Sequence, residues 1–469
     1  MCRLCSALGA ATLVLSAFRL SAGERGAVTL DSSDQRLVQG FQWARRQALA
    51  YVFSGDPVGD WYEASLPGRQ AFCMRDVSHQ STGAQVLGLA AVTRNMLHHF
   101  AASIAESRDW CGYWEIDKYG RPAPVDYKSD KDFWYNLPAN FDLLNCCYRQ
   151  YLWTGDAAYV KDPVFLNFYD RTVNDYVKRW DKDGDGVPES YREYGHRGIG
   201  SYDEDLEFHL LVGADLVAAQ AAAYSAYAAI AKIRGQPDVA AQFRAQSDKL
   251  RTWFNEKWWD PAHQRFYRAM KQDRTLVSRP NGAIPEIWFG VTDPGPKTES
   301  ALSALTAANV EVRSYYPEIA YRYDRCDLGY AKLMDLIDPA LPRREYPEVS
   351  FAVVGAIAEG MVGIRPDARS RTVETFPRLT QQTEWVTLGH LPVFENEIEV
   401  RHSGRTETRL TNQSGPVLTW RAAFPGAHPF LSIDGKLQRA TDGRRRDGAP
   451  ESYVVLRVEP GQRRIARVP

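Results

Sequence analysis

The chain has 469 residues, of which 44% are hydrophobic and 25% charged, a composition typical of a folded globular protein. This length accommodates one large domain with a sizeable core and a smaller second domain. The formal net charge is −1 and no basic block occurs, which argues against nucleic acid as a partner.

The N-terminus resembles a secretory signal peptide. Residues 1–23 contain an early Arg3, a short apolar run and the small residues Ser21, Ala22 and Gly23. We therefore expect a secreted or periplasmic protein after removal of residues 1–23. The alternative is a frayed apolar leader on a cytoplasmic protein. No later apolar run has the length of a membrane span, so no membrane association is predicted.

The cysteines predict free thiols. If residues 1–23 are removed, five cysteines remain, an odd number without metal-ligand spacing: Cys73, Cys111, Cys146, Cys147 and Cys326. At least one buried free thiol is therefore expected, and zinc is not.

Apolar residues recur with helical periodicity through the first two thirds of the chain. The predicted helices cover 34–53, 82–106, 136–153, 162–180, 206–233, 237–258, 297–308, 320–336 and 349–362. Loops rich in aromatic residues, glycine and proline separate them, notably 112–134, 181–205 and 259–286. Helix pairs joined by such loops suggest an (α/α)6 toroid, in which the loops at one end line a central pocket.

The pattern changes after Pro366. Segments such as 397–402, 407–411, 417–422 and 452–458 alternate apolar and polar residues, and turn dipeptides separate them. We expect a mainly α protein in which an (α/α)6 domain (30–366) precedes a small antiparallel β domain (373–469).

An acidic turn precedes the middle of the chain. Asp181, Asp183 and Asp185 alternate with other residues, as in the first half of an EF-hand loop, but position twelve is Arg192. These carboxylates, with Glu189 completing the shell, form a candidate structural calcium site. A plain Asp-Gly turn is the alternative. No cofactor is otherwise required.

Three consecutive acids, Asp203, Glu204 and Asp205, follow an aromatic and glycine-rich loop. Adjacent carboxylates repel each other, which raises at least one pKa, as a general acid requires. Carboxyl groups among aromatic residues suit chemistry on a sugar, because aromatic faces stack on pyranose rings. Asp205 is alternatively the N-cap of the helix predicted to begin at 206.

Five short motifs resemble those of the six-hairpin glycosidases, in particular processing α-glucosidase, mannosylglycerate hydrolase, trehalase and α-L-rhamnosidase-type enzymes. They are Phe72-Cys-Met-Arg-Asp-Val-Ser-His79, Asp183-Gly-Asp-Gly-Val-Pro followed by Gly200-Ser-Tyr-Asp203, Gly213-Ala-Asp-Leu, Arg344-Glu-Tyr-Pro-Glu-Val-Ser-Phe351 and Gly360-Met-Val-Gly-Ile-Arg-Pro-Asp367. The chain has Tyr202 where those enzymes mostly have tryptophan before the acid, and it lacks the large N-terminal β-sandwich of many of them.

The resemblance implies roles for residues in three of these motifs. Asp203 corresponds to the general acid, with Glu204 as a neighbouring candidate. Glu345, and next to it Glu348, corresponds to the general base; Glu384 is a weaker third candidate. Two exposed glutamates paired with arginine are the structural alternative.

The substrate would be held by charged and aromatic groups. The resemblance implies that Arg75, Asp76 and His79 grip the terminal sugar, although a buried Arg75–Asp76 pair with a structural role is the alternative. We expect Trp134, Tyr135 and Tyr202 to form part of the pocket wall.

The predicted function is that of a secreted exo-acting glycoside hydrolase that inverts the anomeric centre, with an oligosaccharide or glycoside as its partner. Three alternatives remain open: a polysaccharide lyase that uses His79, His196 or Tyr202, a carbohydrate-binding protein without catalysis, and a phosphorylase. The sequence does not specify the sugar.

Overall fold

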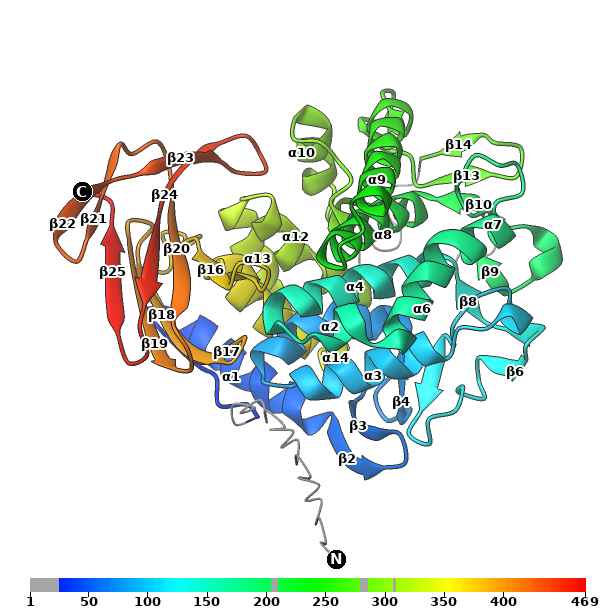
Figure 1. Cartoon of the computed structure of the whole chain (residues 1–469), viewed down its shortest axis with the longest axis horizontal. Coiled ribbons are helices and arrows are strands. Elements are labelled where there is room, and N and C mark those ends of the chain that lie inside the picture. Colours follow the sequence, from blue (N-terminus) through cyan, green and yellow to red (C-terminus); the bar gives the residue numbers. More distant parts are fainter. Residues whose placement is uncertain (1–24, 204–209, 279–285, 307–308) are drawn as a thin grey trace, which may run out of the picture.

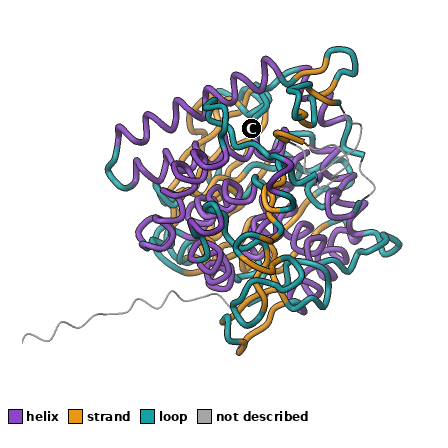
Figure 2. The backbone as a smooth tube through the Cα atoms, turned by 90° about the vertical axis from the view of Figure 1, so that its right-hand side faces the viewer, coloured by secondary structure: helices purple, strands orange, loops and turns teal. Residues whose placement is uncertain are grey.

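The computed structural model describes residues 25–203, 210–278, 286–306 and 309–469. Helices form a body from residue 35 to residue 361, and long strands from residue 365 onward pack against one side of it (Figure 1). Seen from the helical side, short two- and three-stranded ribbons lie among the loops (Figure 2). Both predicted parts of the architecture, helical body and β domain, are confirmed.

Helices of the body alternate along the chain between nearly complete and one-sided burial. The nearly buried set is α2 (Met74–Val86), α4 (Pro138–Thr154), α8 (Ala214–Ile233), η5 (Glu286–Phe289), α12 (Tyr316–Arg322) and α14 (Pro347–Gly355). The one-sided set is α1 (Gln35–Ala50), α3 (Ala90–Ala102), α6 (Pro163–Arg171), α9 (Pro237–Lys257), α10 (Pro296–Ser303) and α13 (Cys326–Ile337). A helix that is buried all round needs neighbours on every side, so the second set covers the first.

Close packing of α2 and α14 depends on glycine. A Cβ at Gly83 would lie 2.1 Å from the carbonyl oxygen of Phe351, and one at Gly355 would lie 3.2 Å from the Gly83 nitrogen. Only hydrogen side chains allow the two backbones to approach this closely. This contact joins the last turn of α2 to the second half of α14, and the two helices lie side by side.

Two sheets form the β domain. One has the order β1-β17-β18-β19-β25-β21-β22 and the other β15-β16-β20-β24-β23. Their strands are β1 (Thr29–Ser32), β15 (Arg365–Asp367), β16 (Thr372–Thr375), β17 (Trp385–Val393), β18 (Asn396–Ser403), β19 (Glu407–Ser414), β20 (Leu418–Pro425), β21 (Phe430–Ile433), β22 (Lys436–Arg439), β23 (Thr441–Arg444), β24 (Pro450–Val458) and β25 (Arg463–Arg467). In β18 every second residue is buried, as the sequence pattern indicates. β1, from the other end of the chain, pairs with β17.

Polar side chains tie the β domain to the helical body. The Trp153 indole N–H donates to the Pro392 carbonyl (3.0 Å), and Arg378, which is fully buried, donates to the Gly360 carbonyl (3.0 Å) and to Asp324 (2.7 Å). A hairpin formed by β23 and β24 reaches back over the helices (Figure 1), where Arg446 donates to the Gly290 carbonyl.

Three predicted helices are divided differently in the structure. The predicted helix 82–106 is the end of α2 plus α3, separated by a turn at Leu87–Leu89, and 320–336 is the end of α12 plus α13. The helix predicted from 206 begins at Ala214, because Leu210–Gly213 is the strand β10. The N-cap of α8 is therefore Gly213, and the predicted capping role of Asp205 on this helix is wrong.

One helix within the described residues is long and apolar enough to cross a membrane. It is α8, with a mean hydropathy of 1.2, and 72% of its apolar window is buried inside the protein. It packs against α4 and α9, which accounts for its apolar composition.

The cysteines behave as predicted over the described ranges. All five are free and buried.

Candidate active site

A cavity of about 280 Å³ opens where α2 and α14 begin. The loop before β4 (Ala71–Cys73), β5 (Glu115–Asp117), the loop before β8 (Tyr135–Asn136) and α11 (Val310–Arg313) complete its wall. Its lining residues are Ser65, Leu66, Arg69, Cys73, Arg75, Asp76, Trp114, Glu115, Asp126, Trp134, Glu311, Tyr346 and Glu348. Carboxyl groups and aromatic faces therefore share a single small space.

The first group in the cavity joins Asp76 of α2 to Glu348 of α14. Arg75 donates to Asp76 (2.9 Å), and Asp76 and Glu348 are 4% and 2% exposed. Burial and the neighbouring Asp76 carboxyl, which also hydrogen-bonds to Glu348, raise the Glu348 pKa well above its ordinary value. A hydrogen bond between two carboxyls requires a proton on one of them, which is why the Asp76 carboxyl raises the Glu348 pKa.

A second carboxyl pair lines the cavity, formed by Glu115 of β5 and Asp126 of the loop that follows β5. Arg69 bridges Glu115 (2.7 Å) and Asp126 (2.9 Å). Burial and the hydrogen bond to Asp126 raise the Glu115 pKa to about 9. The cavity thus contains two carboxyl pairs, each with an arginine beside it and each with one carboxyl whose pKa is raised.

Aromatic rings and a fifth acid also line the cavity. The Arg75 guanidinium lies 5.9 Å from the Trp114 ring centre, and Trp134 stacks on His196 at 5.1 Å. Glu311 lies 3.7 Å from Arg75 and pairs with Arg343 at 2.8 Å. An apolar ring face beside hydrogen-bonding carboxylates suits a sugar.

The two glutamates predicted as general base have different positions. Glu348 is buried and lines the cavity, because Pro347 starts α14 and directs its first turn inward. Glu345 is exposed and is not among the lining residues; its backbone carbonyl accepts a hydrogen bond from Tyr51. Of the two, the structure therefore favours Glu348. The third candidate, Glu384, immediately precedes β17 in the β domain and also does not line the cavity.

The predicted acid loop ends beside the cavity. Tyr202 is buried, lies 6.0 Å from Arg75 and donates its hydroxyl hydrogen to Asp142 (3.2 Å). Its backbone N–H donates to Asp215 (2.6 Å) at the start of α8, where burial raises the pKa of Asp215 to about 6. Asp203 is half-buried and is the last described residue of the loop, and Glu204 and Asp205 lie outside the described residues.

Three predicted sugar contacts lie behind the cavity wall. Tyr135 is fully buried and donates its hydroxyl hydrogen to Asn140. His79 is buried one turn beyond Asp76, stacked on Tyr315 at 3.5 Å, and burial lowers its pKa well below the ordinary value. Tyr202 also does not line the cavity, whereas Arg75, Asp76 and Trp134 do. His79 follows Asp76 by almost one turn on the same face of α2, and therefore lies about 4.5 Å further along the helix axis, beyond the cavity.

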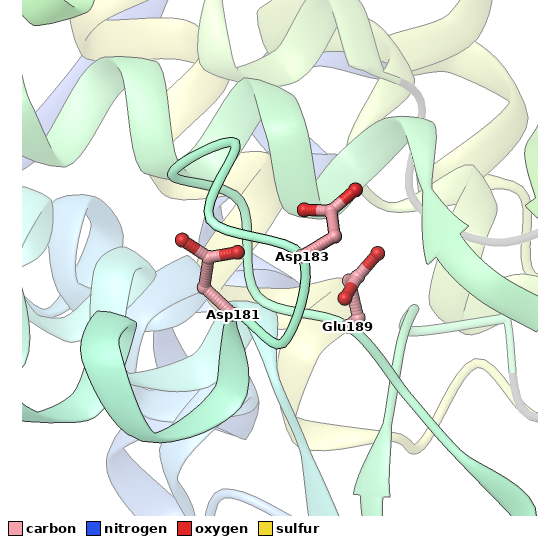
Figure 3. A group of neighbouring side chains, drawn as sticks. All are labelled: Asp181, Asp183 and Glu189. Atoms are coloured by element: carbon pink, nitrogen blue, oxygen red, sulfur yellow. The ribbon is translucent and has the colours of Figure 1, made fainter.

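The acidic turn gathers three of its four predicted ligands (Figure 3). Ligand oxygens of Asp181, Asp183 and Glu189 all lie within 4.8 Å of one another. Asp185 points elsewhere and accepts the backbone N–H of Val187 (2.8 Å). Arg274 donates to Asp183 (2.5 Å) and Glu189 (2.9 Å), so a guanidinium already offsets part of this charge. The oxygens suit calcium in kind, but too few converge for a full shell.

Four charged cavity residues were not predicted from the sequence: Arg69, Glu115, Asp126 and Glu311. Glu115 follows Trp114 in a loop flagged only for its aromatic residues, and nothing in its spacing to Asp126 shows that Arg69 joins them. The register of β4 with β5, which places Glu115 opposite Cys73, creates this group.

No family model matches the chain. No curated protein sequence matches it. Solved structures do. An α-L-rhamnosidase from Dictyoglumus thermophilum superposes with a TM-score of 0.59 at 12% identity, over 94% of this chain and 50% of that one. The chain has a six-hairpin glycosidase-like fold.

Two further structures share this six-hairpin glycosidase-like fold. A GH78 family rhamnosidase of Bacillus sp. GL1 matches with a TM-score of 0.58 at 14% identity, over 82% of this chain and 40% of that one. A putative kojibiose phosphorylase from human microbiome matches with a TM-score of 0.59 at 10% identity, over 92% and 63%. The chain thus spans about 40 to 63% of the length of these proteins.

Proposed function

We propose that this protein is an exo-acting glycoside hydrolase that removes a terminal sugar with inversion. The observation that supports it best is the buried Asp76–Glu348 carboxyl pair in a small cavity with aromatic walls. Such a cavity accommodates one sugar ring, in keeping with exo action. We further propose that the helical body is an (α/α)6 toroid, whose fourth inner position is taken by η5, because nearly buried and one-sided helices alternate six times.

In the proposed mechanism Glu348 is the base and Asp203 the acid. Ionised Glu348 would take a proton from the attacking water, while Asp203 protonates the leaving oxygen from the other face. Inversion requires the two carboxyls to lie roughly 6.5–9.5 Å apart. Arg75 and Asp76 would hold sugar hydroxyls, and Trp114 and Trp134 would pack against the ring. Glu115, with its high proton affinity, offers a second proton donor on the same wall.

Charge argues for a neutral sugar and for water as the nucleophile. Five carboxyl groups and two arginines line the cavity, and Arg69 and Arg75 are both paired with carboxylates. The net negative charge of this lining would repel the uronate that a polysaccharide lyase needs. It would equally repel the phosphate that a phosphorylase needs. These properties favour a hydrolase over both alternatives.

The direct test is a screen of nitrophenyl glycosides with NMR detection of the released anomer. We expect turnover of at least one neutral glycoside, release of the inverted anomer, no stimulation by phosphate and no ultraviolet-absorbing unsaturated product. Glu348→Gln should reduce turnover by roughly 10²–10⁴-fold, whereas Glu345→Gln, three residues away and exposed, should not. Sugar binding without turnover would instead identify a carbohydrate-binding protein. Loss of activity in Glu345→Gln alone would overturn the assignment of the base.

We also propose secretion after cleavage of residues 1–23, and calcium bound by Asp181, Asp183 and Glu189 as a brace for the acid loop. Mass determination of the mature chain tests the first proposal. Chelation tests the second: it should lower the melting temperature, and Asp181→Asn should abolish that response. A melting temperature unaffected by chelator would mean that Arg274 alone balances the turn.

A further inference from the structure

A second cavity, of about 490 Å³, lies at the seam between the helical body and the β domain. It is lined by Asn145, Arg149, Leu152, Trp153, Trp288, Phe289, Arg322, Glu359, Arg365, Pro366 and Arg446. These residues come from the second half of α4, η5, the last residue of α12, η6 (Ala356–Met361) and β15, with Arg446 contributed by the loop between β23 and β24. No lining residue is shared with the candidate active site. Seams between domains are common places for ligand sites.

Positive charge predominates in this seam cavity. Four arginines and one glutamate line it. Arg322 pairs with Glu318 (2.5 Å). Among the described residues the carboxylate that Arg365 approaches is Glu374, at 3.9 Å, and Glu374 also pairs with Arg421 and Arg445. Burial raises the pKa of Glu359 to about 7, so the single lining carboxyl is partly protonated near neutral pH.

Two of the guanidinium groups have donors left over. Within the described residues, Arg149 donates to the Ser78 carbonyl (2.8 Å) and Arg446 to the Gly290 carbonyl, and the Nε–H of each is buried without an acceptor. Arginines near helix C-termini can simply offset helix dipoles. A helix-dipole role does not account for a buried N–H without an acceptor, which costs about 1–3 kcal/mol. An oxyanion in the cavity would supply acceptors for these groups.

The remaining wall is aromatic. Trp288 has Arg322 at 4.6 Å and Arg149 at 5.7 Å from its ring centre, and Trp153 and Phe289 complete this side. Aromatic faces beside guanidinium groups suit a ring that carries an anionic group. We propose that the seam cavity binds a sugar-sized organic anion, whose phosphate or carboxylate pairs with the arginines and whose ring packs against the aromatic wall.

Calorimetry on the full chain tests this site with four probes: inorganic phosphate, glucose 6-phosphate, glucuronate and glucose. We expect one of the two sugar anions to bind at least tenfold more tightly than inorganic phosphate, and glucose not to bind. The better of the two sugar anions identifies the anionic group. Arg365→Gln and Arg446→Gln should each weaken binding at least tenfold.

Arg369→Gln is the matched control, because Arg369 lies four residues from Arg365, pairs with Asp367 on the surface and does not line the cavity. It should bind as the unmodified chain does, and so should Glu348→Gln, which alters only the other cavity. Melting temperatures confirm that each variant is folded; Arg365, with a 42% exposed side chain, is the safer substitution. Absence of binding by both sugar anions, or binding unaffected by Arg365→Gln, would overturn the proposal.

Discussion

At the scale of single residues, the candidate active site combines carboxyl groups of raised proton affinity with aromatic walls. Glu348 and Glu115 both have raised pKa values, in each case because burial is combined with a second carboxyl group. Carboxyl groups in structural ion pairs at a surface do not have raised pKa values, since water stabilises the charged forms. Carboxyl groups that retain protons near neutral pH are a recurring property of glycosidase sites.

Asp76→Asn distinguishes a sugar-binding role from a structural one. Arg75 keeps a partly exposed side chain (17%) and a second carboxylate, Glu311, so we expect the fold to tolerate the change. The melting temperature should stay within a few degrees while activity falls by about 10²-fold or more, because hydroxyl contacts tighten in the transition state. If the pair were structural, stability would fall by roughly 3–5 kcal/mol. Unchanged activity and melting temperature would eliminate both roles.

Glu115→Gln should change the pH dependence of stability. The folded protein holds this proton up to about pH 9, whereas an unfolded glutamate releases it near its ordinary value of 4.5. Its contribution to stability is therefore complete below about pH 4.5 and is lost as pH rises towards 9. Glutamine cannot ionise, so the variant's melting temperature relative to the unmodified chain should increase between pH 5 and 9. The exposed Glu345→Gln serves as control; parallel curves for Glu115→Gln and the unmodified chain would contradict the prediction.

Residue chemistry was only partly predictable from the sequence. Arg75 and Asp76, singled out in the sequence, lie in the first turn of α2 and line the cavity, whereas of the two candidate glutamates Glu348 lines it and Glu345 does not. Glu348 could not be separated from Glu345 without knowing where α14 begins, because one turn of helix decides which carboxyl is buried. The pairing of Glu115 with Asp126 depends on a strand register and on Arg69, and neither is visible in a linear pattern.

At the scale of elements, the position of the candidate base depends on how closely two helices approach. α2 carries Asp76 and α14 carries Glu348, and the contact at Gly83 and Phe351 fixes the distance between these helices. Periodicity predicted both helices but merged α2 with α3, because Gly88 and Leu89 interrupt the backbone without interrupting the apolar pattern. Burial on all sides, as in α14, also removes the amphipathic signal that would locate a helix end.

Gly83→Ala tests this arrangement. Alanine normally stabilises a helix relative to glycine by up to about 1 kcal/mol. Here the added methyl would lie 2.1 Å from the Phe351 carbonyl oxygen, so α2 and α14 must separate. We expect a loss of about 1–3 kcal/mol, measured by denaturant unfolding, together with reduced activity because Asp76 and Glu348 move apart. A stabilised variant with full activity would show that the contact is not tight.

At the scale of the whole molecule, the β domain is part of the same folded unit as the helices. β1 belongs to its larger sheet, the β23–β24 hairpin contacts the helical body, and His402 on β18 hydrogen-bonds to the Val362 carbonyl (2.9 Å). The sequence predicted a change of architecture near Pro366. It did not predict these contacts between the β domain and distant parts of the chain, because strand pairing over more than 350 residues leaves no local pattern. The seam they create is also where the second cavity lies.

Arg378→Met should weaken this seam. Arg378 is fully buried, and its guanidinium joins Asp324 of the helical body to the β domain. Methionine preserves much of the volume but leaves Asp324 with only Arg445 (3.2 Å) as its partner and the Gly360 carbonyl without this donor. Removing one partner from a buried pair costs roughly 3–5 kcal/mol, and the remaining arginine places the expected loss at the lower end.

Scanning calorimetry should show a single transition for the unmodified chain and a lower or divided one for the variant, whereas Arg369→Gln on the nearby surface should melt like the unmodified chain. Two transitions already present in the unmodified chain would mean that the domains unfold independently, and that the seam contacts contribute little to either.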